Sequence, residues 1–101
     1  MNKARRKELS DVIRELNVVQ DRDDLYSCIT TLDNIKDDEQ YYYDNIPENL
    51  QYSQRAESSE QAIEYMEEAL DLLNDVYNED EFDKDSEVIQ EAIEKIEEAK
   101  W

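Results

Sequence analysis

The chain has 101 residues, a formal net charge of −18 at pH 7, and neither glycine nor histidine. A chain this acidic repels DNA, RNA and anionic membranes, and it attracts basic protein surfaces. Without histidine it lacks the commonest general base, and without glycine it lacks the usual phosphate-cradling loop. The composition therefore predicts a single acidic binding domain with no cofactor and no metal, and it argues against an enzyme.

The charge is unevenly distributed along the chain. Residues 1–52 carry 12 acids and 7 bases, whereas residues 53–101 carry 17 acids and 4 bases. Four of the bases lie within the first seven residues, in a stretch without an unbroken apolar run, so we expect neither a signal peptide nor a membrane span. The single cysteine, Cys28, allows no internal disulfide, which favours a reducing cytoplasm.

Apolar residues recur at intervals of three and four through the first half of the chain, which indicates an amphipathic helix. This stripe runs from Leu9 to Ile46, and only the polar stretch 20–24 interrupts it. Pro47 disfavours helical geometry at the residue before it. We therefore expect one long helix over about residues 3–45, straight or bent near the polar stretch, followed by a turn at residues 46–52.

A second apolar stripe, over residues 62–77, predicts a helix that spans about residues 53–79. Ser58 and Gln61 have capping-box spacing and are candidates for its N-terminal cap. The polar run that follows breaks the stripe, so we expect a loop at residues 80–85.

A third stripe, over residues 88–99, predicts a helix of about residues 86–100 with Asp85 or Ser86 as its cap. The second and third helices together nearly match the first in length. We therefore predict an all-α fold, an antiparallel helical hairpin or coiled coil whose second arm is split into two helices. Two arms leave apolar edges exposed, so we also expect a homodimeric bundle unless a partner protein covers them.

Four tyrosines, Tyr41, Tyr42, Tyr43 and Tyr52, crowd the predicted turn. A helix cannot bury three consecutive side chains on one face, so we expect at least one of the first three to be exposed. Exposed tyrosines are frequent anchors at protein interfaces. These residues are therefore candidates for partner binding, with packing of the hairpin end as the alternative.

The turn also carries a motif. Residues 41–55 read YYYDNIPENLQYSQR. This segment resembles the Y-D-N-[MI]-P-E-N-L-Q-x-S-x-R turn of small coiled-coil proteins from phages and integrated mobile elements of Gram-positive bacteria. Tyr52 stands where that family pattern has glycine. The resemblance implies a helical hairpin and a mobile-element origin, hence the cytoplasm of a host bacterium, and it brings no catalytic residues.

Carboxylates of the second helix and of the loop after it are the other candidates for partner binding. Duplex DNA presents one phosphate charge per ~1.7 Å of axis, and a helix lined with carboxylates can imitate such a row. The candidate residues are Glu57, Glu60, Glu64, Glu67, Glu68, Asp71, Asp75, Glu79, Asp80, Glu81 and Asp83.

Several of these acids also have the spacing of magnesium ligands in all-helical nucleotide pyrophosphatases. Such a site would need Asp33, Asp37 and Asp38 of the first helix as its second carboxylate group. Most of these positions lie off the apolar stripe, and no basic or glycine-rich segment nearby would hold a triphosphate. A solvated helix face is the simpler interpretation.

Asp83, Asp85 and Glu87 alternate like the start of a calcium loop, but the glycine of the sharp turn is absent. A helix cap with its loop explains them better. Cys28 lies on the apolar stripe and has no histidine to activate it, so we interpret it as a small buried residue rather than a nucleophile.

The favoured function is an inhibitor that occupies the basic nucleic-acid groove of a host defence protein, such as a CRISPR nuclease or a restriction enzyme, as a DNA mimic. The alternative is a structural or adaptor coiled coil that assembles through its apolar stripes, with the acid serving solubility.

Overall fold

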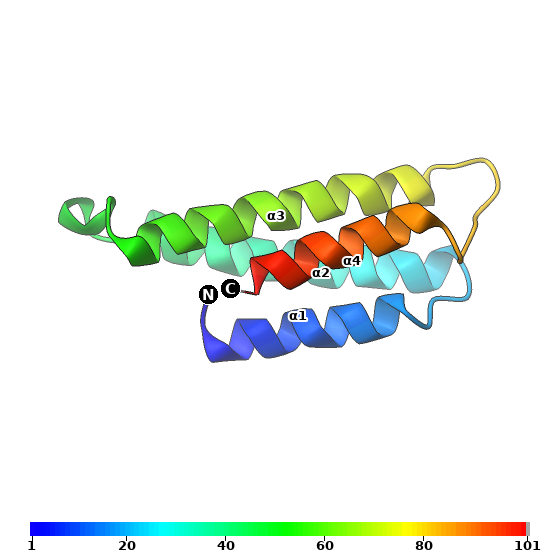
Figure 1. The fold of residues 1–101 in the computed structure, drawn as a ribbon, viewed down its shortest axis with the longest axis horizontal. Helices are drawn as coiled ribbons and strands as arrows, with labels where there is room; N and C mark the ends of the chain where they lie inside the picture. The colour runs from blue at the N-terminus through cyan, green and yellow to red at the C-terminus, as the bar shows by residue number, and fades with distance from the viewer. Residues whose placement is uncertain (101) are drawn as a thin grey trace.

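In the computed structural model, which describes residues 1–100, four α-helices form an up-down-up-down bundle (Figure 1). The helices are α1 (Lys3–Leu16), α2 (Arg22–Asp44), α3 (Gln54–Tyr77) and α4 (Glu87–Ala99), with a short 3₁₀ turn, η1 (Glu48–Leu50), between α2 and α3. Every regular element in the described chain is helical, which confirms the predicted all-α class and the split second arm. None of these helices is both long and apolar enough to cross a bilayer.

The prediction of one helix over residues 3–45 is wrong, because a turn at residues 17–21 divides it into α1 and α2. The side-chain amide of Asn17 donates to a carbonyl of the last turn of α1. Asp21 then begins α2 by accepting a hydrogen bond from the backbone N–H of Asp24 at 2.9 Å. These side-chain caps replace the lost backbone hydrogen bonds and reverse the chain without proline or glycine.

The later boundaries agree with the sequence. The chain reverses after α2 at Pro47, which precedes η1. Ser53, rather than the predicted Ser58, caps α3 by accepting a hydrogen bond from the backbone N–H of Ala56. Ser86, one of the two predicted candidates, caps α4.

All four helices contribute to one hydrophobic core inside a single chain. Leu9, Leu32, Leu73 and Ile96, one from each helix, are completely buried. The apolar stripes therefore find their partners within the chain. The homodimeric bundle stays a prediction, but the core stripes are no longer an argument for it, because they are covered by the other helices of the same chain.

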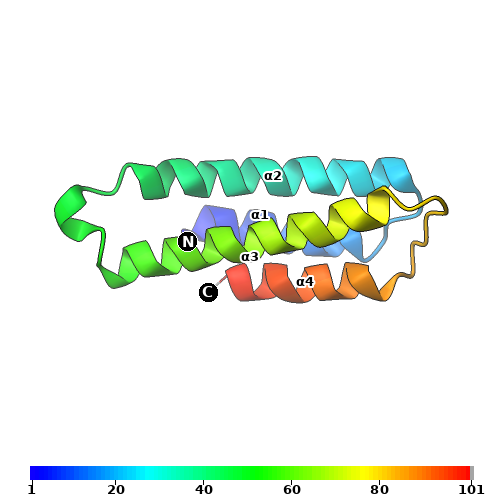
Figure 2. The ribbon, with the colours of Figure 1, turned by 90° about the horizontal axis from the view of Figure 1, so that it is seen from above.

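The middle two helices are longer than the outer two. α2 and α3 have 23 and 24 residues, whereas α1 and α4 have 14 and 13. The excess of about ten residues corresponds to roughly 15 Å of helix. It projects beyond the four-helix part as a two-helix hairpin (Figure 2). We call residues 41–56, at the end of this projection, the hairpin tip.

At the opposite end, Arg22 joins the start of α2 to the end of α3. Its guanidinium donates to the backbone carbonyls of Tyr77 at 3.2 Å, Asp80 at 3.0 Å and Glu79. The last carbonyls of a helix have no partner within the helix, and a cation is favourable at its C-terminal dipole. Arg22 therefore caps α3 and fixes the loop that follows.

We expect Arg22→Ala to lower the free energy of unfolding by about 2 kcal/mol, since a hydrogen bond to a charged group is worth ~1.5–3 kcal/mol and only the bond to Tyr77 is partly buried, whereas those to Glu79 and Asp80 are exposed and contribute little. Thermal unfolding followed by circular dichroism should show a Tm lower by about 10 °C for a domain of this size. Arg22→Lys should recover only part of the loss, because an ammonium lacks the planar fork. Arg14→Ala, which removes an exposed ion pair to Asp11, is the matched control and should change stability by less than about 0.5 kcal/mol.

Candidate protein-binding surfaces

The outward face of α3 carries a row of seven carboxylates. At about 100° per residue they fall within an arc of roughly 100°, on the side of α3 that faces away from the core. Over this stretch of about 27 Å the row presents one carboxylate per ~4 Å. These residues are Glu57, Glu60, Glu64, Glu67, Glu68, Asp71 and Asp75. The structure thus brings together all the candidate acids of this helix.

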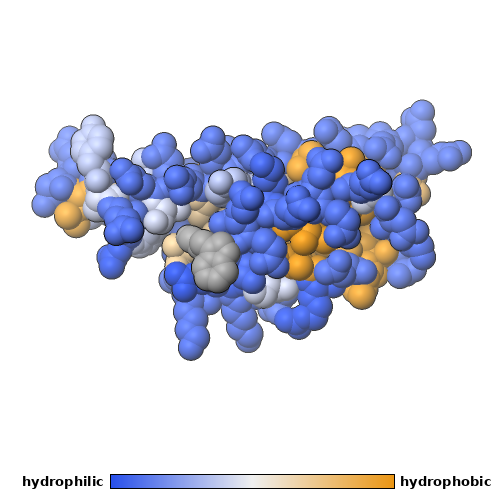
Figure 3. Space-filling view, in the orientation of Figure 1, coloured by the Kyte–Doolittle hydropathy of each residue, from blue (hydrophilic) through white to orange (hydrophobic). Residues whose placement is uncertain are grey.

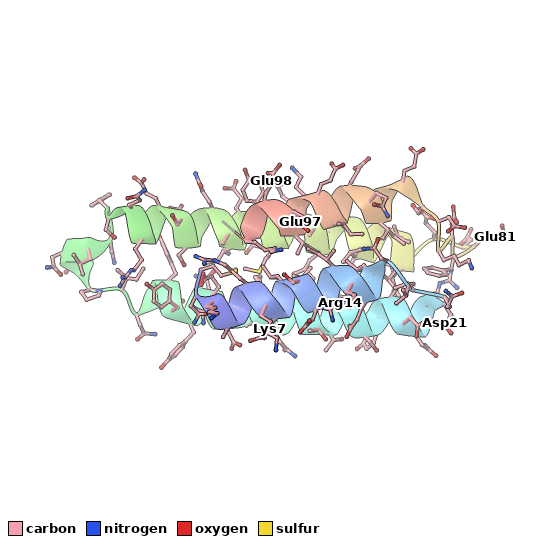
Figure 4. The ribbon with its side chains drawn as sticks, turned by 60° about the horizontal axis from the view of Figure 1, so that its bottom comes forward. Lys7, Arg14, Asp21, Glu81, Glu97 and Glu98 are labelled. Atoms are coloured by element: carbon pink, nitrogen blue, oxygen red, sulfur yellow. The ribbon has the colours of Figure 1, made fainter. Side chains whose placement is uncertain are left out.

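A second row follows α4, where Glu87, Glu91, Glu94 and Glu98 share one face. The two rows lie on neighbouring helices, since α3 and α4 pack directly against each other. Packed helices lie about 8–10 Å apart. Interaction with the carboxylate of Glu98 on α4 raises the pKa of Tyr65 on α3. Figure 4 shows Glu98 projecting from α4.

Few of these acids are neutralised inside the molecule. Of the 17 carboxylates after residue 52, two form ion pairs within residues 1–100. Glu68 contacts Lys95 of α4 at 3.1 Å, and Glu97 contacts Lys100 at 3.4 Å. The hydrogen bond and the charge of Glu68 raise the pKa of Lys95. The other carboxylates remain available to an external cation, and the two rows act as one anionic surface.

The loop between α3 and α4 extends this surface to the end of the bundle. Glu79, Asp80, Glu81 and Asp83 are all exposed there, and Figure 4 shows Glu81 at that end. We call the two rows with this loop the acidic surface. Hydrophilic residues likewise cover most of the face shown in Figure 3, with hydrophobic patches between them.

The basic residues of the N-terminal segment lie away from the row on α3. Lys3, Arg6, Lys7 and Arg14 are exposed on α1. α1 packs against α2 and α4, so α3 lies across the bundle from it. The charge asymmetry of the sequence therefore becomes an asymmetry between two sides of the molecule.

The four candidate tyrosines do not form a single surface. Tyr41 and Tyr52 are 74% and 93% exposed, which confirms that at least one of the tyrosine triple faces solvent. Tyr42 and Tyr43 are half-buried. The guanidinium of Arg5 lies over the ring of Tyr42, 5.5 Å from its centroid, in a cation–π contact. Tyr42 therefore packs the base of the hairpin tip, while Tyr41 and Tyr52 remain free for contact.

A buried charge pair, which was not predicted from the sequence, lies beside Tyr42. Glu39 is completely buried and accepts a hydrogen bond from Nε of Arg5 at 3.2 Å. Its other carboxylate oxygen lies 3.7 Å from the amino group of Met1. The signal was present, because Glu39 occupies the stripe position between Ile35 and Tyr42. An acid at such a position predicts a buried partner.

The acids considered as metal ligands are only partly brought together. Asp33, Glu67 and Asp71 line a groove of about 620 Å³ between α2 and α3, together with Lys36. Within residues 1–100 no three His, Cys, Asp or Glu side chains are arranged to hold a metal ion. In the loop before α4, the Asp83 carboxylate instead accepts a hydrogen bond from the backbone N–H of Asp85 at 2.9 Å.

Cys28 is buried in the core, as predicted. Burial, followed by the negative charges of Glu15 and Asp24, raises the pKa of its thiol to about 11. The thiolate is the reactive form of cysteine, so this environment is the opposite of an activated nucleophile.

We expect the Cys28 thiol to react with a thiol-specific reagent at about pH 8 roughly 100-fold more slowly in the folded protein than in urea, where its pKa returns to ~8.5. The rate of colour release from an aromatic disulfide reagent measures this ratio. A native rate within a few-fold of the unfolded rate would show that the side chain is accessible and ionised.

Comparisons of the chain with protein-family models, with curated proteins and with solved structures found no match. A function is therefore inferred from the side chains described above.

Proposed function

We propose that this protein is an acidic helical module that binds the basic, nucleic-acid-binding surface of another protein in place of nucleic acid. The observation that supports this proposal best is the pair of carboxylate rows on α3 and α4. Both rows lie on rigid helices and are largely free of internal ion pairs. They face outward without any rearrangement, so binding does not require the surface to be ordered first.

The spacing of the charges supports the same function. The row on α3 presents one carboxylate per ~4 Å, and one strand of DNA presents one phosphate per ~3.4 Å. The second row lies on α4, the helix that packs directly against α3. Along α3, a groove lined with lysine and arginine can thus meet anionic charges at nearly the linear density that one DNA strand presents.

The class of partner follows from the resemblance of the turn to mobile-element proteins. Elements that enter a bacterium encounter nucleases that bind foreign DNA through basic grooves. We therefore propose an anti-CRISPR or anti-restriction inhibitor that acts in the cytoplasm of the host. Direct binding to nucleic acid or to an anionic membrane is disfavoured by the net charge of −18.

The alternative, an adaptor that assembles through its apolar stripes, receives less support. Leu70 and Leu73 of the stripe on α3 are 8% and 0% exposed inside the bundle. An adaptor of this kind would need to open its own core before it could bind.

A pull-down from the lysate of a Gram-positive host, performed at low and at moderate salt, tests the proposal. We expect a basic nucleic-acid-binding protein to be retained at about 50 mM salt and largely released at about 200 mM, because many ionic contacts are lost together. Duplex DNA should displace it. Retention that salt and DNA leave unchanged would contradict the proposal.

A further inference from the structure

We infer that the hairpin tip is a self-association surface, which docks tip to tip on a second copy of this chain with Tyr52 of each copy in the tip pocket of the other. This inference concerns a different part of the molecule from the acidic surface and does not depend on the proposed function. It rests on the apolar exposure, the pocket and the charge of the tip.

Exposed apolar side chains gather at the hairpin tip. Among the described residues five large hydrophobic side chains are exposed, and three of them, Tyr41, Leu50 and Tyr52, belong to the tip. Tyr52 projects almost completely into solvent at 93% exposure. A side chain with this much apolar area and little conformational entropy is an effective interface anchor.

The same tip contains a pocket of about 460 Å³. This volume lies within the range of about 300–1,000 Å³ that is typical of pockets that hold a ligand or side chain. Its apolar wall is formed by Tyr41, Tyr42, Ile46, Pro47 and Leu50. The tip thus carries both a projecting ring and a cavity with a matching apolar lining.

Polar groups complete the edge of the pocket. Arg5, Asp38 and Arg55 line it, and none of the ion pairs within residues 1–100 involves Arg55. Asp44 and Glu48 are exposed on the same tip. A second copy can therefore offer a carboxylate to the unpaired guanidinium, and the two-fold symmetry repeats the contact.

The low net charge of the tip also makes it the part of the surface where two copies repel each other least. Residues 41–56 contain two acids and one base, so nearly all of the net charge of −18 lies elsewhere. The molecule is 49 Å long, and the tip forms one end of it. Tip-to-tip docking directs the two acidic bodies away from each other, far beyond the screening length of about 8 Å in physiological salt.

The symmetry of the contact follows from the sequence positions. Tyr52 lies between Leu50 and Ser53, which both line the pocket. A projecting side chain next to its own pocket can cross a two-fold axis into the pocket of the partner, while the partner does the same. The result is a closed dimer rather than an open filament.

The area of the tip predicts a weak dimer. An aromatic side chain buries ~150–250 Å², so the three exposed residues offer roughly 400 Å² per copy. Stable interfaces bury about 800 Å² on each side. We therefore expect the protein to be monomeric when dilute and to dimerise at high concentration.

Sedimentation equilibrium of the full chain over a wide concentration range tests the inference. We expect the dimer fraction to rise with concentration and also with salt, because salt screens the repulsion between two acidic chains. Tyr52→Ser should weaken association at least about tenfold, given the value of a buried interface tyrosine. Val18→Ser, at an exposed residue far from the tip, is the matched control and should leave association unchanged.

Cysteine cross-linking locates the contact. Gln51→Cys adds an exposed thiol to the tip, and Glu81→Cys adds one at the opposite end of the bundle. The buried Cys28 should not compete. A short bis-maleimide should couple two Gln51→Cys chains much faster than two Glu81→Cys chains. Equal coupling rates, a monomer at every concentration and salt, or association that Tyr52→Ser leaves intact would each overturn the inference.

The salt dependence separates this inference from the proposed function. Binding of a basic partner to the acidic surface should weaken with salt, whereas self-association through the tip should strengthen. Dimerisation of this kind without capture of a basic partner would support the tip contact and contradict the proposed function. Salt-sensitive capture of a basic partner by a protein that stays monomeric would support the proposed function and contradict the tip contact.

Discussion

A variant in which Glu64, Glu67, Asp71 and Asp75 are changed together to lysine is expected to lose binding to the basic partner by at least about 100-fold near physiological salt. Each reversal removes one phosphate-like contact and adds a repulsive charge, and affinity for a polyanion site depends steeply on the number of ionic contacts. The four side chains are exposed on the outward face of α3. Binding measured by interferometry or by inhibition of the captured nuclease reports the loss.

The fold of this variant should remain intact, which far-ultraviolet circular dichroism can verify. We exclude Glu68 from the set because it pairs with Lys95, so its reversal would also disturb the contact between α3 and α4. With Glu68 left unchanged, a loss of binding can be attributed to the altered surface charge rather than to a disturbed helix contact.

The matched control places the same charge change on the other helices. Glu8, Glu15, Asp23 and Asp44 are exposed carboxylates of α1 and α2, and their change to lysine shifts the net charge equally. If the acidic surface is the binding site, this control should keep most of the affinity. Equal losses in both variants would indicate a general charge effect, and full binding by the α3 variant would exclude DNA mimicry.

The regular part of the fold was predictable from the sequence because it depends on local signals. The apolar stripes located α3 and α4, and Pro47 located the reversal after α2. A serine at the predicted position, Ser86, caps α4. Periodicity, proline and capping residues act within a few positions of the chain, so one sequence suffices to interpret them.

The division of the first arm was not predicted, because its signals were weaker than proline or glycine. Asn17 and Asp21 end one helix and begin the next through single side-chain hydrogen bonds. The apolar stripe is interrupted only at residues 20–24 and resumes at Leu25, and such a short interruption fits a bend as well as a reversal. That reversal converts a long two-armed hairpin into a four-helix bundle, and it removes the need for a second copy to cover the core.

The candidate surfaces were only partly predictable for a similar reason. The helical period placed the acids of α3 on one face, but the alignment of that row with the one on α4 depends on the packing of two helices. Exposure at the hairpin tip likewise depends on how far α2 and α3 extend beyond α1 and α4. The pairing of Glu39 with Arg5 needs the antiparallel register of α1 and α2, which no local pattern contains.

Replacing Glu39 by leucine is expected to lower the free energy of unfolding by about 3–5 kcal/mol, since removal of one partner leaves the other charge buried without compensation. Arg5 would lose its ion pair while its side chain remains largely covered. For a domain of this size the loss corresponds to a Tm lower by about 15–25 °C. Thermal and urea unfolding of the two proteins measure the difference.

Replacing both partners distinguishes the cost of leaving one buried charge unpaired from the contribution of the ion pair itself to stability. In the double variant Arg5→Met with Glu39→Leu, no buried charge of the pair is left alone, and apolar side chains of similar size fill the site. Such replacements are commonly neutral or stabilising, so we expect the double variant to recover stability to within about 1 kcal/mol of the natural chain. The amino group of Met1, which also lies near Glu39, sets a limit on this recovery. A double variant as unstable as Glu39→Leu would show that the carboxylate stabilises the bundle through contacts other than Arg5.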